Sequence, residues 1–410
     1  MIDAAACHVT VGIIITDSAI TNAALNNDID IVEITASLNN NIVHQRRITT
    51  SLFRGNRMQI SAERLTQIAY ELLRHAGCEH DEAECVAHHL VGANLKGHDS
   101  HGVGMLPEYV SFIAAGNMHP NTPARLVQDG GAVLQFAGDR GFGQRTGREA
   151  MQAAIERVKT TGVCLMTLSS TCHLGRIGTY GEMAAQAGLI SIHFVNVSDI
   201  APLVAPFGGS DARFGTNPIC IAFPGSDNNP DFILDFATSV VALGKTRVAW
   251  LAGKTFDEPV MLDRDGHLSA DPRVMWEGEQ TGALLPIARH KGGGLILAAE
   301  LLAGILSGGG TIHPGNPHEG AIVNNMTTIL IDPTKLVGMS WLQQEYDAML
   351  AYVRASRVPD SSAPILIAGE PERQARAQRL ADGIVISEGE WRKITDAGCS
   401  LGMSAAFFAA

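Results

Sequence analysis

The stretch Val163-Cys-Leu-Met-Thr-Leu-Ser-Ser-Thr-Cys-His173-Leu-Gly-Arg-Ile-Gly-Thr-Tyr-Gly181 carries the pattern that decides the fold. Its first six residues are apolar enough for a buried strand, and a helix is predicted from Gly178 to Ala187, where Gly188 ends it. Leu189–Val197 then forms a second buried apolar run. A strand, a polar turn, a helix and another strand together form the unit of an α/β fold.

The same alternation extends in both directions along the chain. Strands are predicted at 132–137, 233–236 and 327–331, and helices at 148–159, from about Ser239 and from Lys291. Nearer the N-terminus, Ser61 is expected to cap a helix that Gly77 ends, and Asp81-Glu-Ala-Glu84 resembles a capping box that opens a second helix through Leu95. The sequence therefore predicts a largely parallel or mixed sheet with helices on both faces and a helical N-terminal region.

Composition limits the class of protein. The 410 residues are 46% hydrophobic and 18% charged, which excludes disorder as the main theme. The net charge of −12 argues against a nucleic-acid partner. The longest apolar stretch, 295–306, contains Glu300 and is too short to span a membrane. Seven cysteines without a Cys-x-x-Cys pair favour a reducing compartment, so we expect a cytoplasmic protein.

Residues 1–57 differ from the rest of the chain. They are rich in Asn and show no sustained helical or strand period. We expect them to be a disordered or non-native N-terminal extension, with Met58 as the natural start; a genuine mobile arm is the alternative. Residues 58–410 are expected to form two interwoven α/β lobes.

The glycine-rich stretch Gly141-Phe-Gly143-Gln-Arg-Thr-Gly147 looks like a dinucleotide-binding turn, since it follows a strand and opens a helix. A Rossmann unit also needs an acidic residue at the end of the next strand, and that strand ends Leu168-Ser-Ser-Thr171. We therefore reject that interpretation and expect these glycines to allow close packing at a turn.

Two polar segments are candidates for chemistry. His173 follows a strand end and precedes a helix N-terminus, which favours a neutral imidazole that can act as a general base; an ordinary hydrogen-bonded loop histidine is the alternative. Ser100 and His101 can donate hydrogen bonds to a substrate carboxylate or carbonyl. Two alternatives stay open there: a capped helix end with surface histidines, and a metal site that includes His98.

Several turns have the composition of backbone that approaches a ligand closely. Pro206–Pro218 and Leu234–Ser239 are dense in Gly, Asn and hydroxyl side chains. Lys245 follows on the next helix, and Lys291-Gly-Gly-Gly294 opens an apolar helix whose free N–H groups are suited to a pyrophosphate.

Together these segments resemble the malate/L-lactate dehydrogenase-type oxidoreductases. The resemblance runs from about Met58 to Met403, and the branch it resembles most is that of the hydroxycarboxylate dehydrogenases. Its specific motifs are Gly97-His-Asp-Ser-His-Gly-Val-Gly-Met-Leu-Pro107, His173-Leu-Gly-Arg-Ile-Gly178, Phe214-Gly-Thr-Asn-Pro218, Asp235-Phe-Ala-Thr238, Gly244-Lys245 and His290-Lys-Gly292. The resemblance implies a non-Rossmann α/β fold, binding of NAD(H) or NADP(H), a homodimer, and no catalytic metal.

The resemblance also implies roles for individual residues. His173 matches the acid/base histidine, and Ser100 and His101 match residues of the substrate pocket. Cofactor-contacting positions correspond to Asp235, Phe236, Ala237, Lys291, Ser198 and Asn324. Many members place an arginine four residues after the pocket histidine, and here that position is Met105. The substrate carboxylate must then be held by another cation, for which the candidates are Arg176, Arg213 and Lys245.

The function implied is reversible hydride transfer between a nicotinamide cofactor and a 2-hydroxy acid or 2-oxo acid. Within the same class, a ureidoglycolate-type dehydrogenase and a cyclic ketimine reductase are alternatives. Two alternatives come from other classes: a metal-dependent hydrolase built on His98, His101 and His173, and a cofactor-binding protein without catalytic activity.

Overall fold

The computed structural model of the chain describes residues 57–251, 253–278, 282–359 and 364–409. The prediction for residues 1–57 therefore lies outside the described residues, apart from Arg57. The chain from Gln59 to Ala410 forms one compact unit.

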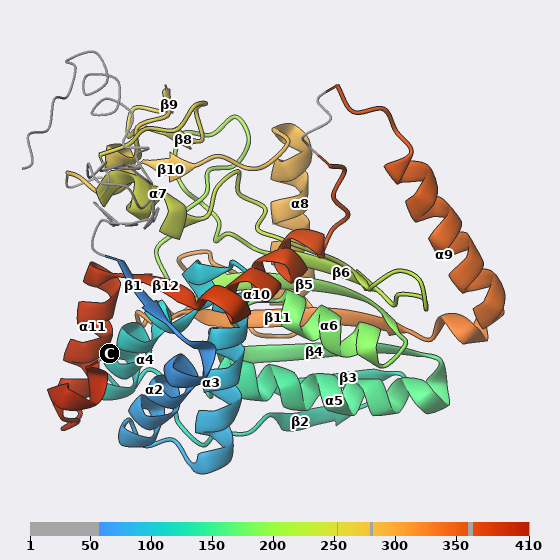
Figure 1. Cartoon of the computed structure of the whole chain (residues 1–410), viewed down its shortest axis with the longest axis horizontal. Coiled ribbons are helices and arrows are strands. Elements are labelled where there is room, and N and C mark those ends of the chain that lie inside the picture. Colours follow the sequence, from blue (N-terminus) through green and yellow to red (C-terminus); the bar gives the residue numbers. More distant parts are fainter. Residues whose placement is uncertain (1–56, 252, 279–281, 360–363, 410) are drawn as a thin grey trace, which may run out of the picture. The chain divides into compact units, whose positions relative to one another are not determined.

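A seven-stranded mixed sheet forms the centre of this unit (Figure 1). Its strands follow the order β2-β3-β4-β11-β5-β6-β7. Their bounds are β2 (Arg125–Asp129), β3 (Val133–Ala137), β4 (Val163–Cys172), β5 (Ile190–Ser198), β6 (Ile219–Phe223), β7 (Phe232–Phe236) and β11 (Val323–Ile331). Smaller sheets are formed by β1 (Arg57–Ile60) with β12 (Ile384–Ser387), and by β10 (Ala283–Leu284), β8 (Met261–Leu262) and β9 (Leu268–Ser269) in that order.

The mixed sheet was one of the two forms predicted, and the largely parallel form was wrong. Among neighbouring strands of the main sheet, β3 and β4 pair in parallel, and the other described pairs are antiparallel. The predicted unit β4-helix-β5 is present, but β11 lies between its two strands and pairs with both in antiparallel fashion. A strand from the C-terminal third of the chain has thus entered the place where a parallel pair was expected.

The six predicted helices are present with different ends, and four further helices were not predicted: 106–114, 339–354, 370–382 and 388–400. The longer ones are α2 (Ala62–His75), α3 (His80–Leu95), α4 (Leu106–Ala114), α5 (Gly143–Thr161), α6 (Gly178–Gln186), α7 (Leu243–Leu251), α8 (His290–Glu300), α9 (Met339–Arg354), α10 (Glu370–Asp382) and α11 (Glu388–Ser400). The short 3-10 turns are η1 (Asp99–His101), η2 (Val103–Met105), η3 (Pro272–Met275), η5 (Pro333–Lys335) and η6 (Ala405–Phe408), and α8 continues into a π turn, η4 (Leu301–Ile305).

Three predicted helix starts can be compared with the observed ones. Ser61 accepts a hydrogen bond from the backbone N–H of Arg64 at 3.1 Å, so the predicted N-cap of α2 is confirmed. The capping box predicted at Asp81 was wrong, because α3 begins at His80 and places Asp81 inside its first turn, where a carboxylate favours the helix dipole. α5 begins at Gly143, five residues before the predicted start at Arg148, because the glycine-rich stretch is itself helical.

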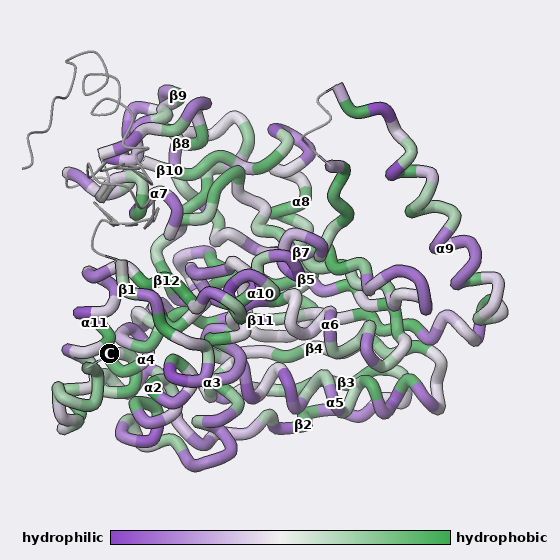
Figure 2. Tube along the Cα trace, viewed as in Figure 1, coloured by the Kyte–Doolittle hydropathy of each residue, from purple (hydrophilic) through white to green (hydrophobic). Residues whose placement is uncertain are grey.

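Helices cover both faces of the main sheet, as predicted. On one face α5 and α6 pack against a cluster that includes Met326 and Leu330 of β11 (Figure 1). Successive side chains of a strand point to opposite faces. Thr327 therefore points to the other face, where its hydroxyl donates to the carbonyl of Leu302 in the π turn after α8 at 2.7 Å. Figure 2 shows the hydrophobic colouring concentrated on the sheet strands and the hydrophilic colouring on α10.

A separate hydrophobic cluster lies beside the small β10-β8-β9 sheet and includes Met261, Leu284 and Ile296. The division into two lobes stays a prediction. Helix α11, near the C-terminus, lies beside α4 in Figure 1 and packs against it. Every helix in the described part of the chain is too short or too polar to span a lipid bilayer.

Candidate active site

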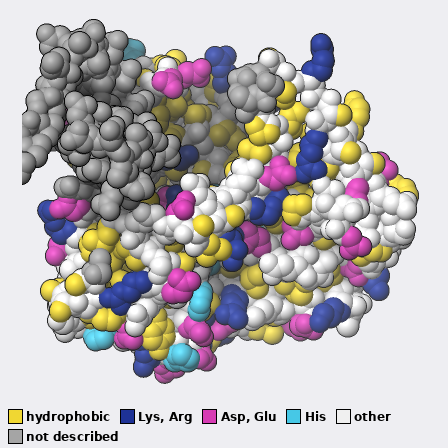
Figure 3. Space-filling view, viewed as in Figure 1, with side chains coloured by type: hydrophobic (Ala, Val, Ile, Leu, Met, Phe, Trp, Pro, Cys, Tyr) yellow, Lys and Arg dark blue, Asp and Glu magenta, His cyan; other side chains and the backbone are white. Residues whose placement is uncertain are grey.

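A cavity of about 1090 Å³, called the main cavity below, lies where the ends of β4 and β7 meet η1, α7 and the helices near the C-terminus. Figure 3 shows this side of the molecule hollowed, with hydrophobic and charged side chains around the hollow. The lining includes most of the residues singled out in the sequence: Ser100, His101, Met105, His173, Arg176, Asp235, Phe236, Ala237, Lys245 and Asn324. Segments far apart in the sequence therefore meet at one site.

His173 stands directly after β4 and is buried. Its Nδ1 forms a 2.7 Å hydrogen bond with the hydroxyl of Tyr109 on α4, which leaves Nε2 as the ring nitrogen available to a ligand. The His101 ring stacks on His173 with centroids 5.4 Å apart. Burial, together with the neighbouring His101 and His89, holds the pKa of His173 well below its usual range. The imidazole is therefore neutral near neutral pH and able to accept a proton.

The loop that follows His173 is held from three sides. Asn324 Oδ1 accepts a hydrogen bond from the backbone N–H of Leu174 at 2.8 Å, and His89 Nε2 accepts one from the N–H of Arg176 at 3.1 Å. On the third side, a Cβ on Gly143 would lie 2.5 Å from the carbonyl oxygen of His173 and nearer still to that of Cys172. The predicted packing role of this glycine-rich turn is confirmed, since Gly143 lets α5 approach the loop.

Ser100 and His101 lie in η1, at the edge of the main cavity. The Ser100 hydroxyl and His101 Nδ1 are 2.9 Å apart, so the two side chains form a hydrogen-bonded pair. Burial is the main cause that lowers the pKa of His101 to about 4, and nearby His98 and Arg176 lower it further. A Cβ on Gly244 would lie 3.1 Å from Cβ of Ser100, so a glycine there lets α7 approach Ser100 closely.

Arg176 is a buried cation with spare hydrogen-bonding capacity. Its Nη1 donates to Glu182 at 2.8 Å, and its Nε lies 3.8 Å from Asp235 Oδ2. Its Nε and Nη2 have no hydrogen-bond partner among the described residues. Burial would raise the pKa of Glu182, but Arg176 and Lys96 together lower it. Two unpaired N–H groups on a buried guanidinium suit a carboxylate or a carbonyl.

Asp235 lies at the end of β7 and accepts a hydrogen bond from the backbone N–H of Gly178 at 2.7 Å. Burial raises its pKa, although Arg176 opposes that shift. The structure thus joins the start of α6 to the end of β7 through this carboxyl group, which lies beside Phe236 and Ala237 in the cavity lining.

Three of the predicted site residues are not among the described residues that line the main cavity. Arg213 is 62% exposed and pairs with Asp211 at 2.8 Å. Lys291 is exposed in the first turn of α8, and Ser198 is buried at the end of β5, where its hydroxyl reaches the carbonyl of Val323. The structure therefore brings Arg176 and Lys245 to the cavity but leaves Arg213 outside it.

The structure also adds residues that sequence reasoning did not select. Tyr109, which bonds His173, gives no signal in the sequence beyond an apolar helix position. Gln144 donates to the Tyr109 hydroxyl at 2.8 Å and lies within the glycine-rich turn that was assigned only a packing role. Arg247 of α7 and Glu390 of α11 also line the main cavity. Burial raises the pKa of Glu390, and nearby Asp99 raises it further.

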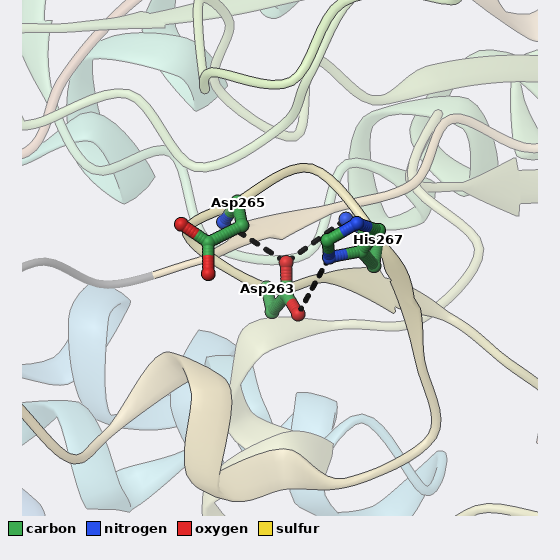
Figure 4. A group of neighbouring side chains, drawn as sticks. All are labelled: Asp263, Asp265 and His267. Carbon is green, nitrogen blue, oxygen red and sulfur yellow. Dashed lines mark hydrogen bonds and ion pairs between the residues drawn. The ribbon is translucent and has the colours of Figure 1, made fainter.

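Among the described residues, the side chains grouped closely enough to hold a metal ion are not in the main cavity. They are Asp263, Asp265 and His267, in the turn between β8 and β9 (Figure 4). One carboxylate oxygen of Asp263 accepts the backbone N–H groups of Asp265 and His267, each at 2.9 Å. This carboxylate therefore closes the hairpin turn. His98, the third histidine of the hydrolase alternative, bonds Glu372 at 3.2 Å through Nε2.

Comparisons with known proteins identify the family of the chain. The family model for malate/L-lactate dehydrogenase matches residues 60–395. Hydroxycarboxylate dehydrogenase B of Escherichia coli is 43% identical over 347 residues, which cover 84% of this chain and 95% of that protein. A solved Escherichia coli structure assigned to the malate/lactate dehydrogenases has a TM-score of 0.81 at 42% identity, covering 86% of this chain and 97% of that one.

A more distant structure is that of delta1-piperideine-2-carboxylate reductase from Pseudomonas syringae pvar. tomato. Its TM-score is 0.72 at 25% identity, and the match covers 83% of this chain and 99% of that one. Both the family model and the Escherichia coli relative span most of the described unit, with His173, Arg176 and Asp235 inside the matched residues. The chain therefore belongs to the malate/L-lactate dehydrogenase family.

Proposed function

We propose that this chain is a nicotinamide-dependent 2-hydroxycarboxylate dehydrogenase in which His173 exchanges a proton with the substrate oxygen. One observation carries the assignment: His173 is buried and neutral, and its Nδ1 is occupied by Tyr109, so Nε2 is the nitrogen left for the substrate. General acid–base catalysis needs such a group within reach of the reacting oxygen. Family membership supports the class of reaction and of substrate.

The main cavity fits a dinucleotide cofactor together with a small acid. Single small-molecule ligands occupy cavities of about 300–1,000 Å³, and the main cavity is larger, at about 1090 Å³. The residues that would hold the cofactor there are Asp235, Phe236, Ala237 and Asn324, all of which line it. Lys291 and Ser198 stay predicted cofactor contacts, although neither lines this cavity. When bound, the nicotinamide accepts hydride from the substrate carbon or returns it.

Arg176 is the proposed partner of the substrate carboxylate. Its unpartnered Nε and Nη2 supply donors that a carboxylate can satisfy, which the Met105 side chain cannot do. Lys245 and Arg247 add positive charge from α7. Arg213 is not proposed for this role, because it is exposed and paired with Asp211.

The protonation state of His173 sets the pH dependence. In oxidation, neutral Nε2 takes the hydroxyl proton; in reduction, the imidazolium gives that proton to the keto oxygen. Because burial lowers the pKa of His173, the imidazolium becomes scarce as pH rises through that pKa. The rate of reduction should therefore fall with rising pH, while oxidation keeps its base.

The test is a screen of NADH and NADPH oxidation with pyruvate, oxaloacetate, 2-oxoglutarate, aryl pyruvates and a cyclic imine. His173→Asn should lose about 10²- to 10⁴-fold in kcat and still bind the cofactor, measured by NADH fluorescence. His75→Asn, on an exposed last turn of α2, is the matched control. Full activity of His173→Asn would refute the assignment.

The same screen tests the choice of substrate. The likeness to a piperideine-carboxylate reductase favours a cyclic ketimine as the second candidate. A kcat/KM higher for the cyclic imine than for every 2-oxo acid would select that candidate.

The homodimer and the cytoplasmic location belong to the same proposal. Helix α9 carries Trp341 and Tyr352, which are 57% and 77% exposed, and such aromatic side chains are enriched at interfaces. Figure 2 shows hydrophobic turns among the hydrophilic ones on this helix. Six free cysteines in the described residues favour a reducing compartment. Light scattering of the purified chain should give twice the monomer mass.

A further inference from the structure

We propose that Gln144, acting through Tyr109, decides which ring nitrogen of His173 carries the proton and so whether that histidine can serve as a base. The inference rests on the proposed role of His173 and concerns two residues that act on it without touching the substrate. Both are therefore positioning residues.

The three side chains form a buried chain of hydrogen bonds. Gln144 Nε2 lies 2.8 Å from the Tyr109 hydroxyl oxygen, and that oxygen lies 2.7 Å from His173 Nδ1. Tyr109 is fully buried and Gln144 is 1% exposed. The chain runs from the first turn of α5 through α4 to the end of β4. The Tyr109 hydroxyl is therefore closed to bulk solvent, so its hydrogen and the hydrogen on Nδ1 of His173 must each find an acceptor among these three side chains.

The base form of His173 allows only one direction for the hydrogen bonds between His173, Tyr109 and Gln144. To accept a proton, Nε2 must carry none, so the neutral ring carries its hydrogen on Nδ1 and donates it to Tyr109. The Tyr109 hydroxyl has a single hydrogen, which it must then donate to Gln144. An amide accepts a hydrogen bond only through its oxygen. The base form therefore requires Oε1 of Gln144 to face Tyr109.

The opposite orientation of the Gln144 amide reverses the direction of both hydrogen bonds. When Nε2 of Gln144 donates to Tyr109, the tyrosine hydrogen goes to Nδ1, and the ring hydrogen must sit on Nε2. That form cannot take a proton from an alcohol. It is also the orientation in which Gln144 Oε1 is buried without a partner. The two amide ends have nearly the same shape, so a half-turn of the amide converts one form into the other.

A second cavity, of about 440 Å³, gives the far end of the amide a place to find a partner. It is lined by Gln144 and Tyr180 and by the charged or polar side chains Glu84, His88 and Arg148. A polar cavity of this size can hold water. Water there can accept from Nε2 of Gln144 in the base form, which leaves Oε1 for Tyr109.

The proton and electron balance of oxidation is simple. The substrate O–H bond breaks and its proton joins Nε2, while hydride leaves the carbon for the nicotinamide. The resulting imidazolium still donates its Nδ1–H to the Tyr109 oxygen, and the Tyr109 hydroxyl keeps its own hydrogen and still donates it to Oε1 of Gln144. The chain therefore stabilises the charged ring without moving a second proton.

Other titratable groups face the chain and must stay unchanged in the test. They are His101 and His89 beside His173, Glu108 and Cys172 near Tyr109, and Glu84, Cys85, His88 and Arg148 around the second cavity.

The test uses Gln144→Met and Tyr109→Phe, with Gln152→Met on the exposed face of α5 as the matched control. The readout is the ¹⁵N spectrum of histidine-labelled full-length protein, in which the His173 signals are identified by their loss in His173→Asn. Wild type and Gln152→Met should show the Nδ1–H tautomer. Gln144→Met should shift it toward Nε2–H, and Tyr109→Phe should give a mixture.

Kinetics provide the second readout. Both variants should lose about 10- to 100-fold in kcat for oxidation with KM changed less than about threefold, since substrate contacts remain. The pH at which reduction declines should move downward in both variants, because Tyr109→Phe removes the acceptor of the imidazolium Nδ1–H and Gln144→Met removes the acceptor of the Tyr109 hydrogen. A purely structural role would leave the tautomer and this pH unchanged.

The outcomes separate this inference from the proposed function. An unchanged His173 tautomer in both variants would overturn the inference even if His173→Asn is inactive. Changed tautomers with a fully active His173→Asn would support the hydrogen-bond chain and overturn the catalytic role. If one variant fails to fold, the other carries the same spectroscopic comparison.

Discussion

A single methyl group at Gly143 should disable this enzyme by displacing the loop that carries His173. Gly143 is the first residue of α5, and a Cβ there would lie 2.5 Å from the carbonyl oxygen and 2.6 Å from the carbonyl carbon of His173. These atoms belong to the backbone and cannot rotate away as a flexible side chain can. Restoring ordinary van der Waals distance needs a relative shift of about 1 Å between α5 and the loop.

Two opposing contributions set the change in folding stability that Gly143→Ala should cause. Overpacking costs about 1–3 kcal/mol, and replacing a helical glycine by alanine returns about 0.5–1 kcal/mol. The net loss of stability should be about 0–2.5 kcal/mol, which leaves the protein folded. A misplacement of about 1 Å at a catalytic group costs about 10²-fold in rate. Activity should therefore fall far more than stability.

The assay compares urea unfolding and kcat/KM of Gly143→Ala with those of Gly92→Ala. Gly92 lies in the last turn of α3, where an added Cβ meets nothing within 4 Å. The control should gain about 0.5–1 kcal/mol and keep its activity. If Gly143→Ala retains kcat/KM within about twofold of wild type, the loop is not held by this contact and the reasoning fails.

Three further predictions follow from the charges and histidines. Burial lowers the pKa of His193 to about 3, so the folded state stays neutral while the unfolded state takes a proton below about pH 6.5. Stability should fall by about 2 kcal/mol from this group between pH 7 and 5, and His193→Gln should remove that part of the difference in urea unfolding; an equal pH difference in the variant would contradict it. Lys245→Met and Arg247→Met should each raise KM for the 2-oxo acid about tenfold with kcat nearly constant, and an unchanged KM would remove that residue from the substrate site. EDTA should leave turnover intact, whereas a loss restored by Zn²⁺ would favour the metal-dependent hydrolase.

Local patterns in the sequence predicted the strand, turn and helix around His173, because each of these depends on residues near one another. The position of β11 between β4 and β5 was not predictable in this way. Its pairing with β4 joins residues about 150 positions apart, such as Thr171 and Asn324, and an apolar run does not specify which strand it will pair with. The mixed sheet was therefore predicted as one of two forms, but the order of its strands was not.

Local sequence patterns also could not predict which of the candidate cations lies at the site. Arg176 and Arg213 look alike in sequence, since each lies in a glycine-containing turn. Only tertiary packing shows that Arg176 is buried with two unpaired nitrogens and that Arg213 is exposed beside Asp211. Tyr109 was not predicted as a site residue for a related reason, because a residue at an apolar helix position can equally well belong to the hydrophobic core. Burial removes these polar groups from water and strengthens each hydrogen bond that they form. Burial depends on the whole fold, so local sequence patterns do not show it.

The opposition between an acidic protein and an anionic substrate is resolved within a few ångströms of Arg176. The whole chain carries −12, which on average repels a carboxylate. At the site, however, Glu182 is shared by two cations: Arg176 Nη1 at 2.8 Å and Lys96 Nζ at 2.6 Å. Asp235 Oδ2 lies 3.8 Å from Arg176 Nε, and burial raises the pKa of this carboxyl group. These groups lie in a buried place, where screening by salt is weak. A substrate carboxylate can supply the missing acceptors for Nε and Nη2 of Arg176.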